Sequence, residues 1–315
     1  MITVVTPAYN ADRYIARAIA SVQAQSVADW EMVIVDDGSA DRTAAIIDDL
    51  ARKDPRIRPI HIPNGGALNA RLTGISEARG EYVTFLDADD TLRPCALETL
   101  LGHMTPDRDI TVANLNLDNR RDFEHGISGQ LTAEEYVRAI LLGHTSIGNY
   151  AKLYRPRLFE GFRVPAGRIT LNEDLLLLIH CASRAGQVFV DPKTVVYDYL
   201  WHDDSVSKSQ HPPLEEWLRL FDEVERLIIP FGGRLREAFN RFRLNRLLDK
   251  VILEGIDADA SEAAIAQLMA ESRDMDLTAD EQKCLKLLRS PLKRRFASWP
   301  RLIHNTLRRL YHTLK

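Results

Sequence analysis

The strongest constraint on the fold is a regular alternation of two kinds of segment over residues 1–92, with a period of about 25 residues. Short runs rich in β-branched residues predict strands, and the stretches between them repeat apolar residues at helical spacing. Alternating strands and helices are typical of a parallel sheet with right-handed crossovers. The sequence therefore predicts an α/β fold with strands at Ile2–Thr6, Trp30–Val35, Ile57–Ile62 and Tyr82–Leu92, and with helices after Asp12, at Thr43–Ala51 and at Ala67–Ala78.

The alternation is less regular after residue 92, and the chain becomes wholly helical after Pro212 and Pro213. Thr132 and Glu135 have the spacing of a capping box, which predicts a helix start. We expect a mostly parallel central sheet flanked by helices over residues 1–210, and an all-helical C-terminal region over residues 211–315. The further predicted elements are strands at Asp109–Leu117, Gln187–Val190 and Thr194–Tyr199, a partly strand-like segment at Asn149–Phe159, and helices at Thr132–Leu142, Asn172–Ala182, Leu214–Ile229, Leu235–Glu254, Ser261–Glu271 and Thr278–Leu288.

Polar clusters lie at the tips of three of the predicted strands, at Pro7–Asn10, Asp36–Ser39 and Asp87–Asp90. Each cluster alone has the composition of an ordinary turn. In an open parallel sheet, however, ligands bind beyond the carboxyl ends of the strands. Three polar clusters at one sheet edge therefore favour a shared pocket for a polar, phosphorylated ligand.

The third cluster contains three carboxylates, of which Asp87 and Asp89 project to the same side of an extended chain. A divalent cation would relieve their mutual repulsion, and oxygen ligands suit magnesium, manganese or calcium. The alternative is that Asp90 or Thr91 caps the helix that follows, with Pro94 in its first turn. The residues alone leave both interpretations open.

Composition and missing motifs exclude several classes of protein. The formal net charge of −4 gives no reason to expect nucleic acid, and three widely spaced cysteines favour a reducing cytoplasm. No apolar run reaches the roughly 20 residues of a membrane-spanning helix, and Ile2 already begins a strand, so no signal peptide is expected. Without GxGxxG or GxxxxGK[ST], a bound nucleotide would need a metal and Arg71 or Lys152 to balance its charge.

Five motifs in this order resemble those of family 2 glycosyltransferases with the GT-A fold. They are TPAYN at Thr6–Asn10, VDDGS at Val35–Ser39, ARGEYVTFLDADD at Ala78–Asp90, KLYR at Lys152–Arg155 and FRVPAGRITLNED at Phe162–Asp174. The resemblance covers residues 1–210 and leaves out the helical tail. It implies a nucleotide-sugar-binding half at residues 1–115 and an acceptor-binding half at residues 116–210.

The resemblance also implies a role for each matching residue. Asp174 would be the catalytic base, and Mn²⁺ or Mg²⁺ would bind the donor diphosphate with Asp89 and His202 as protein ligands. By residue type alone, a place in the first turn of a helix capped by Asn172 is favoured over catalysis for Asp174, and His202 would suit a solvated loop. The implied nucleotide-binding residues are Pro7, Ala8, Tyr9, Asp36, Arg71 and Asp87, and the implied acceptor or phosphate contacts are Lys152, Glu173 and Trp201.

A metal-dependent, inverting glycosyltransferase is the function that the resemblance implies. It would move a sugar from a nucleotide sugar, with a UDP-sugar expected, to a hydroxyl of a glycan or polyprenyl-linked acceptor in bacterial surface polysaccharide synthesis. The absence of a QxxRW motif favours a nonprocessive enzyme. Leu72, Asn149 and Leu200 depart from the family pattern at expected donor contacts and leave the donor sugar open.

Two other functions compete with this one. A noncatalytic, membrane-associated assembly partner would retain the fold, although the intact acidic motifs disfavour it. A nucleotidyltransferase on a related sheet is disfavoured because its glycine-rich first loop is missing.

The C-terminal tail after Glu281 contains basic residues but no acidic one. Within residues 292–314, apolar residues recur every three or four positions, which is typical of a helix that lies in a membrane interface. Contact with anionic lipid would suit a cytoplasmic enzyme that acts peripherally at the inner face of the membrane. The same apolar stripe would equally pack on the protein's own helices or in a homodimer. No nucleic-acid-binding module accompanies the basic residues.

Overall fold

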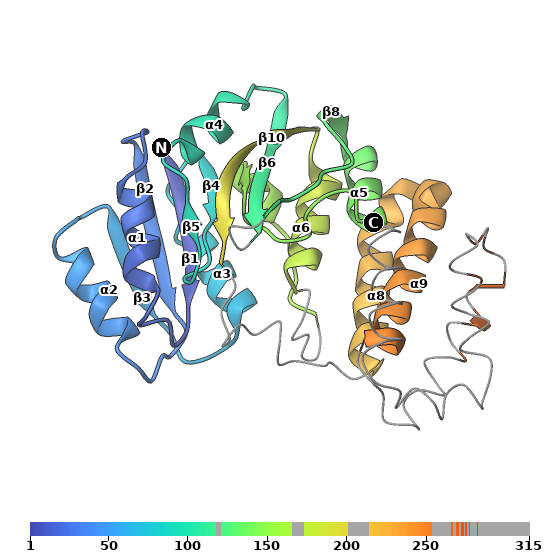
Figure 1. Cartoon of the computed structure of the whole chain (residues 1–315), viewed down its shortest axis with the longest axis horizontal. Helices are drawn as coiled ribbons and strands as arrows, with labels where there is room; N and C mark the ends of the chain where they lie inside the picture. Colours follow the sequence, from blue (N-terminus) through green and yellow to red (C-terminus); the bar gives the residue numbers. More distant parts are fainter. Residues whose placement is uncertain are drawn as a thin grey trace. The chain divides into compact units, whose positions relative to one another are not determined.

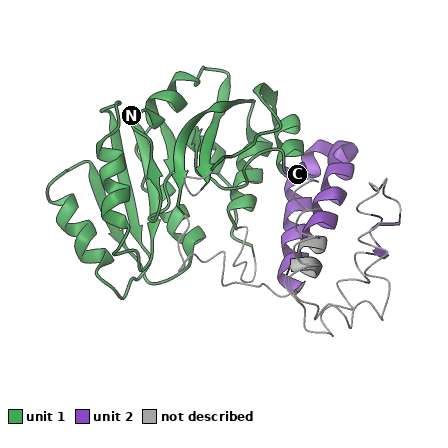
Figure 2. Ribbon diagram, viewed as in Figure 1, with its two compact units in different colours: residues 1–140, 144–210 green, residues 141–143, 211–315 purple. Residues whose placement is uncertain are grey.

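The computed structural model describes residues 1–117, 121–165, 173–200 and 214–253, together with isolated positions between 266 and 282. These residues form two compact units, one made of residues 1–140 and 144–210 and one made of residues 141–143 and 211–315 (Figure 2). The predictions that lie outside the described residues concern Asn172, Trp201, His202, the tail helix at residues 292–314 and almost all of Ser261–Glu271 and Thr278–Leu288.

The first half of unit 1 is a parallel sheet with helical crossovers (Figure 1). Its strands lie in the order β3-β2-β1-β4, and each pairs in parallel with its neighbour. The alternating sequence pattern predicts this arrangement, and the structure confirms it. The elements are β1 (Ile2–Ala8), α1 (Ile15–Gln23), β2 (Trp30–Asp36), α2 (Thr43–Ala51), β3 (Ile57–His61), α3 (Ala67–Ser76) and β4 (Tyr82–Phe85).

The second half of unit 1 continues the same sheet with strands of both directions. Strand β9 is antiparallel to β4 and to β6, whereas β6 and β10 pair in parallel. The predicted α/β fold with a helix-flanked central sheet is confirmed, and its antiparallel strands are an addition that periodicity did not reveal. The elements are β5 (Thr91–Leu92), α4 (Ala96–Gly102), β6 (Arg108–Leu117), β7 (Arg121–Asp122), β8 (Gly129–Thr132), α5 (Ala133–Leu142), β9 (Lys152–Tyr154), a 3₁₀ helix (Pro156–Phe159), α6 (Glu173–Arg184) and β10 (Gln187–Tyr199).

Helices cover both faces of the parallel strands. Val33 and Val35 of β2 pack with Ala70 of α3 on one face, while the alternate residues of β2 belong to the larger core that includes α1. Successive side chains of a strand point to opposite faces, so a strand buried on both faces reads as a continuous apolar run. Helix α3 lies so close to the sheet that a Cβ added at Gly74 would be 2.4 Å from Cγ1 of Val5.

The starts of the helices match the predictions at one site and differ at another. The carboxylate of Glu135 accepts a hydrogen bond from the backbone N–H of Thr132 at 2.8 Å, so the predicted capping box of α5 is confirmed. Helix α4, in contrast, begins at Ala96 without a side-chain cap. The prediction that Asp90 or Thr91 caps this helix is wrong, because the chain first pairs with β10 through β5.

The described part of unit 2 consists mainly of two helices joined by a 3₁₀ segment. The helices lie side by side (Figure 1), and the rings of Phe221 and Phe242 meet edge to face with centroids 5.8 Å apart. Within the connection, Gly232 has a φ of 61°, which residues with a side chain rarely adopt. Among the helices described in either unit, none is long and apolar enough to cross a membrane. The elements are α8 (Leu214–Ile228), the 3₁₀ segment (Ile229–Leu235) and α9 (Arg236–Leu253).

Candidate functional site

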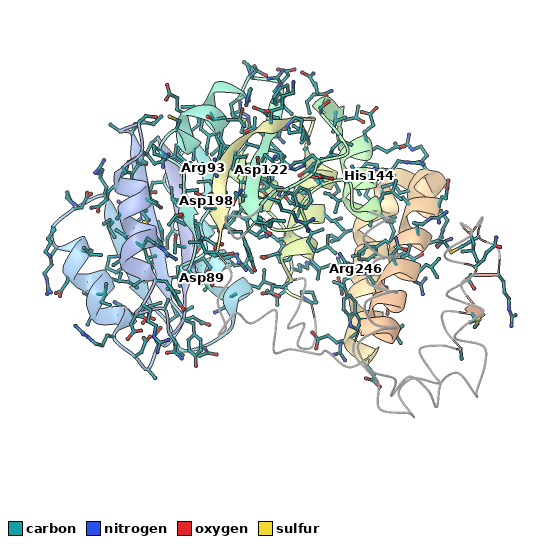
Figure 3. The ribbon with its side chains drawn as sticks, viewed as in Figure 1. Asp89, Arg93, Asp122, His144, Asp198 and Arg246 are labelled. Atoms are coloured by element: carbon teal, nitrogen blue, oxygen red, sulfur yellow. The ribbon has the colours of Figure 1, made fainter. Side chains whose placement is uncertain are left out.

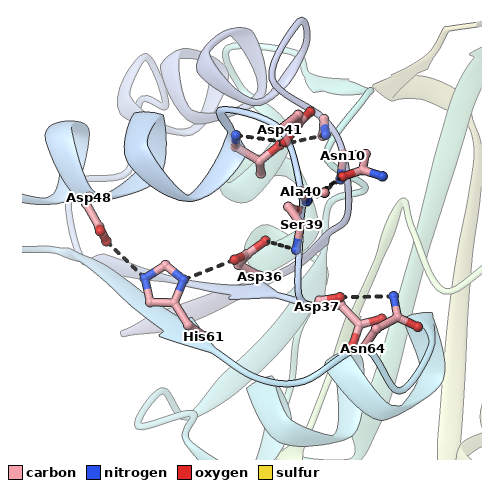
Figure 4. Close-up of polar contacts among 11 residues, drawn as sticks. Asn10, Asp36, Asp37, Ser39, Ala40, Asp41, Asp48, His61 and Asn64 are labelled. Atoms are coloured by element: carbon pink, nitrogen blue, oxygen red, sulfur yellow. Dashed lines mark hydrogen bonds and ion pairs between the residues drawn. The ribbon is translucent and has the colours of Figure 1, made fainter.

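The loops that follow β1 and β2 are held together by their own polar groups (Figure 4). The backbone N–H of Asn10 donates to Ser39 Oγ at 3.0 Å, and Asn10 Oδ1 accepts from the N–H of the residue after Ser39 at 2.9 Å. Asn10 has a φ of 48°, a conformation that asparagine tolerates better than most residues. Of the predicted nucleotide-binding residues here, Tyr9 is exposed, Pro7 is half-buried and Ala8 is buried.

Asp36 ends β2 and keeps its carboxylate almost buried, with 6% of the side chain exposed. Its Oδ1 accepts the backbone N–H of Ser39 at 3.2 Å, and its Oδ2 lies 3.1 Å from Nδ1 of His61 (Figure 4). Each oxygen keeps a second lone pair. The carboxylate can therefore still accept an N–H group from a ligand, as its predicted role requires.

Asp37 has a different function from its neighbour. Its two carboxylate oxygens accept the backbone N–H groups of Gly65 and Gly66, each at 2.8 Å. The backbone comes so close here that a Cβ added at Gly38, which has a φ of +72°, would lie 2.8 Å from the backbone N of Asn64. Asp37 thus anchors the loop before α3.

The acidic turn after β4 is connected to β10 and α3. Oδ1 of Asp87 accepts a hydrogen bond from Nη2 of Arg71 at 2.8 Å, and the backbone N–H of Asp87 donates to the Tyr197 hydroxyl at 3.2 Å. Asp89 is partly exposed on this turn (Figure 3), and its backbone carbonyl accepts from Arg17 at 2.9 Å. The two aspartates predicted to face a ligand therefore differ, since only Asp87 is paired with Arg71.

Asp90 is a buried anchor for the acidic turn. Its carboxylate accepts the Tyr197 hydroxyl and the backbone N–H of Leu200, both at 2.7 Å. Burial raises the pKa of Asp90 well above its ordinary value, and the negative charges of Asp87 and Asp89 raise it further. A second link between this part of the chain and β10 is the ion pair of Arg93 with Asp198 (Figure 3). Arg93 Nη2 lies 2.9 Å from Asp198 Oδ1.

Arg71 on α3 connects the acidic turn to the start of α6. Its guanidinium is buried, with Nη1 2.7 Å from Oδ1 of Asp174 and 3.9 Å from Oε1 of Glu173. Burial opposes the charge of Arg71, but the carboxylates of Asp174 and Asp87 outweigh this effect and raise its pKa above the ordinary value. A permanently charged group therefore lies between residues that are 16 and 103 positions away in the sequence.

Two acidic side chains open α6, and both lie at this site. Nδ2 of Asn149 donates to the backbone carbonyl and to Oδ1 of Asp174, each at 3.1 Å. Burial raises the pKa of Asp174, and the positive charge of Arg71 limits the rise. Burial and the neighbouring charge of Asp174 raise the pKa of Glu173 to about 7. The pair can accept a proton at a higher pH than isolated carboxyl groups would.

Lys152 is fully buried at the start of β9. Its ammonium donates to Ser146 Oγ at 2.8 Å, to the Gly148 carbonyl at 2.7 Å and to the Tyr150 carbonyl at 3.3 Å. The predicted contact of Lys152 with acceptor or phosphate stays a prediction, and all three bonds of its ammonium go to the loop that contains Asn149. Burial lowers the pKa of Lys152 to about 7.

Three residues that build this site were not predicted. Tyr197 connects Asp87 with Asp90, and its ring stacks on that of Tyr150 with centroids 4.9 Å apart. The role of His61 could have been inferred from the parallel register, which places it opposite Asp36. Asn149 was noted only as a departure from the family pattern.

A complete metal site is not formed by the described side chains. Among residues 1–117, 121–165, 173–200 and 214–253, no three His, Cys, Asp or Glu side chains are grouped as a metal ion would require. His202 and Trp201 lie outside these ranges, so their predicted contacts stay predictions.

Comparison with known proteins identifies related sequences. Residues 3–160 match the family described as Glycosyl transferase family 2. The chain is 32% identical over 265 residues to the succinoglycan biosynthesis protein ExoO of Rhizobium meliloti, covering 79% of this chain and 71% of that protein. It spans less than half the length of several other curated relatives that it matches.

Two solved structures show the same fold at low sequence identity. Staphylococcus aureus TarS in complex with UDP-GlcNAc has a TM-score of 0.69 and 20% identity, covering 94% of this chain and 87% of that chain. The mannosyltransferase PcManGT of Pyrobaculum calidifontis, in complex with GDP-Man and Mn²⁺, has a TM-score of 0.52 and 14% identity, covering 99% of this chain and 87% of that chain.

Proposed function

Because this chain belongs to glycosyltransferase family 2, we propose that it transfers a sugar from a UDP-sugar to a hydroxyl group of a glycan or polyprenyl-linked acceptor. Bacterial surface polysaccharide synthesis is the process that we propose, and the similarity to the succinoglycan biosynthesis protein ExoO supports it. The complex of TarS with UDP-GlcNAc supports the choice of nucleotide.

One observation carries the proposal: a single buried arginine bridges the acidic turn after β4 and the acidic start of α6. In the proposed assignment, the turn belongs to the donor side and α6 to the acceptor side. Arg71 pairs with Asp87 on the first side and with Asp174 on the second. Asp174, the potential base, is therefore separated from the proposed donor site only by the Arg71 side chain. A direct displacement requires such proximity.

Asp174 is the proposed catalytic base. It would take the proton of the acceptor hydroxyl while that oxygen forms a bond to the anomeric carbon, and the bond from this carbon to the diphosphate oxygen would break in the same displacement. A single displacement would invert the anomeric configuration. The raised pKa of Asp174 supports the role, since a carboxylate with a higher pKa is a stronger base.

Asp89 is the proposed protein ligand of Mn²⁺ or Mg²⁺, with His202 as a second one. The carboxylate of Asp89 fits because it offers a hard oxygen on a partly exposed turn at a strand end. With few protein ligands in reach, the ion would be bound jointly with the donor diphosphate. When bound, it would stabilise the negative charge of the departing nucleotide.

The remaining assignments also stay proposals. Asp36 would accept an N–H group of the base, with Pro7, Ala8 and Tyr9 lining it, and Glu173 and Trp201 would contact the acceptor. Residues 1–115 would bind the donor, residues 116–210 the acceptor, and the tail at residues 292–314 would contact a membrane surface. The raised pKa of Glu173, about 7, supports a role near the transferred proton.

Nucleotide release from a panel of UDP-, GDP-, dTDP- and CMP-sugars, with manganese and with EDTA, tests the proposal. We expect release from a UDP-sugar that depends on the metal. Absence of release and of nucleotide binding across the whole panel would refute it.

A further inference from the structure

His61 forms a bridge between two carboxylates at the end of β3 (Figure 4). Its Nδ1 lies 3.1 Å from Oδ2 of Asp36, and its Nε2 lies 3.0 Å from Oδ1 of Asp48 on α2. The His61 side chain is 42% exposed, whereas that of Asp36 is only 6% exposed. The imidazole thus connects a solvent-facing helix to the buried carboxylate at the end of β2.

The geometry favours the doubly protonated ring. Ionised carboxylates only accept hydrogen bonds, and a neutral imidazole has a single N–H to donate. Both contacts of His61 can therefore be hydrogen bonds only when the ring is an imidazolium. The hydrogen bond with Asp36 raises the pKa of His61, burial opposes this effect, and Asp48 raises the pKa further.

Neighbouring charges do not compete for His61. Asp36 on β2 and Asp48 on α2 are the charged groups that face the ring. Asp37 directs its carboxylate to the amides of Gly65 and Gly66 instead. At the other end of β3, Arg58 is paired with Glu31 and Glu77.

We propose that His61 is a positioning residue for recognition of the donor's base, and that its protonation strengthens donor binding. The inference rests on the proposed function, in which Asp36 accepts an N–H of the base. With His61 and Ser39 holding one lone pair of each oxygen, the Asp36 carboxylate is fixed in one orientation. The remaining lone pairs of the Asp36 carboxylate can then accept hydrogen bonds from the N–H groups of the nucleotide base.

Donor affinity should consequently fall as pH rises. Below the raised pKa of His61, both carboxylate contacts are made and the orientation of Asp36 is fixed. Above that pKa, the single N–H must leave either Asp36 or Asp48 without its donor. The loss of one such contact corresponds to about a three- to tenfold weaker Kd.

Calorimetric titration of the full chain with UDP-GlcNAc and UDP-glucose, from about pH 6 to about pH 8.5, measures this effect. A nucleotide sugar is preferable to UDP because the terminal phosphate of UDP itself titrates near pH 6. The wild type should bind more weakly at the upper end of this range, with a midpoint above the ordinary histidine value of about 6.5.

Two variants separate the contributions. His61→Asn retains one N–H donor for Asp36 but does not titrate, so its Kd should be independent of pH. Asp48→Asn removes a charge from an exposed position, so the midpoint should move to lower pH. His103→Asn is the matched control, because His103 pairs with Asp191 at 3.3 Å on the other half of unit 1.

The outcomes distinguish this role from the proposed function. A pH-independent Kd of the wild type, or a wild-type pH dependence in His61→Asn, would overturn the role of His61 and leave the proposed function intact. If the wild type binds no UDP-sugar at any pH, the proposed function fails and the role of His61 fails with it.

Discussion

The carboxylates after β2 and those around α6 lie in contrasting environments. Asp37 and Asp41, after β2, accept hydrogen bonds from backbone N–H groups of neighbouring loops. Glu173 and Asp174, by contrast, are partly buried beside each other and beside one arginine. In the first region each carboxylate has its own backbone N–H donors. In the second region several carboxylates lie around one guanidinium, that of Arg71.

These environments shift the pKa values of the carboxyl groups in opposite directions. Burial opposes the ionisation of Asp41, but hydrogen bonds from Thr43 and Asp12 outweigh it and lower the pKa of Asp41. Burial and the charge of Asp174 raise the pKa of Glu173 to about 7. The first region therefore suits recognition of a ligand by a permanent acceptor, and the second suits proton transfer near neutral pH.

Replacement of the proposed base should give the largest effect. In Asp174→Asn, the amide cannot take the acceptor proton, so turnover should fall by about 10² to 10⁴. The Kd of the UDP-sugar should change little, because the proposed function places Asp174 on the acceptor side. Nucleotide release and calorimetric binding are measured on the same preparation. Wild-type turnover in this variant would remove Asp174 from the role of base.

Asp36→Asn tests the recognition side of the comparison. The substitution removes the negative charge, and the new amide presents N–H groups where the proposed contact with the nucleotide base requires an acceptor. The Kd of the UDP-sugar should therefore weaken by about 10- to 100-fold. Turnover at saturating donor should change much less. Asp41→Asn is the matched control, since the carboxylate of Asp41 accepts hydrogen bonds from Thr43 and Asp12 in neighbouring segments of the chain. Equal loss of affinity in both variants would contradict the assignment of Asp36.

Asn149→Ala should change the pH profile of turnover. The hydrogen bond from Asn149 favours the ionised form of Asp174, so its removal should raise the pKa of Asp174 further. The rise of turnover with pH should then occur at higher pH, with a loss of about three- to tenfold at neutral pH. Asn114→Ala removes another buried asparagine, one that donates to the Pro192 carbonyl at 2.8 Å, and should leave the profile unchanged. A shifted profile in both variants would argue against a specific role for Asn149.

Lys152→Met should have the smallest effect on turnover and donor binding, and should change stability instead. The unfolded chain keeps a proton on Lys152 that the folded chain releases at about pH 7. Unfolding therefore takes up a proton between about pH 7 and about pH 10, and the wild type should gain stability relative to the variant as pH rises through this window. Urea unfolding at both ends of the window measures the difference. The exposed control Lys193→Met should change stability with pH in parallel with the wild type. The same parallel dependence in Lys152→Met would contradict the low pKa of Lys152.

Local patterns predicted much of the fold. The first four strands and three helices were found because β-branched runs and helical spacing are local signals, and the capping box at Thr132 is another. Strand β9 was predicted only as a partly strand-like segment, because its three residues carry too little periodicity. Its antiparallel pairing with β4 and β6 depends on contacts distant in sequence.

The candidate site was less predictable for the same reason. Residue type identified Asp87 as a candidate and the family resemblance identified Asp174, but neither indicated that Arg71 would bridge them. Lys152 was assigned to a ligand because a lysine suits phosphate, whereas the fold buries its ammonium in a loop. Charge and motif thus indicate which residues can act, and burial decides which of them face the ligand.

The pH dependence of turnover at saturating UDP-sugar tests the central claim most directly. If a buried carboxylate beside Arg71 accepts the proton, UDP release should rise with pH about a midpoint above the ordinary carboxyl range of roughly 4. This rise should be absent from the residual release by Asp174→Asn. A midpoint within the ordinary carboxyl range, or the same rise in the variant, would contradict the account.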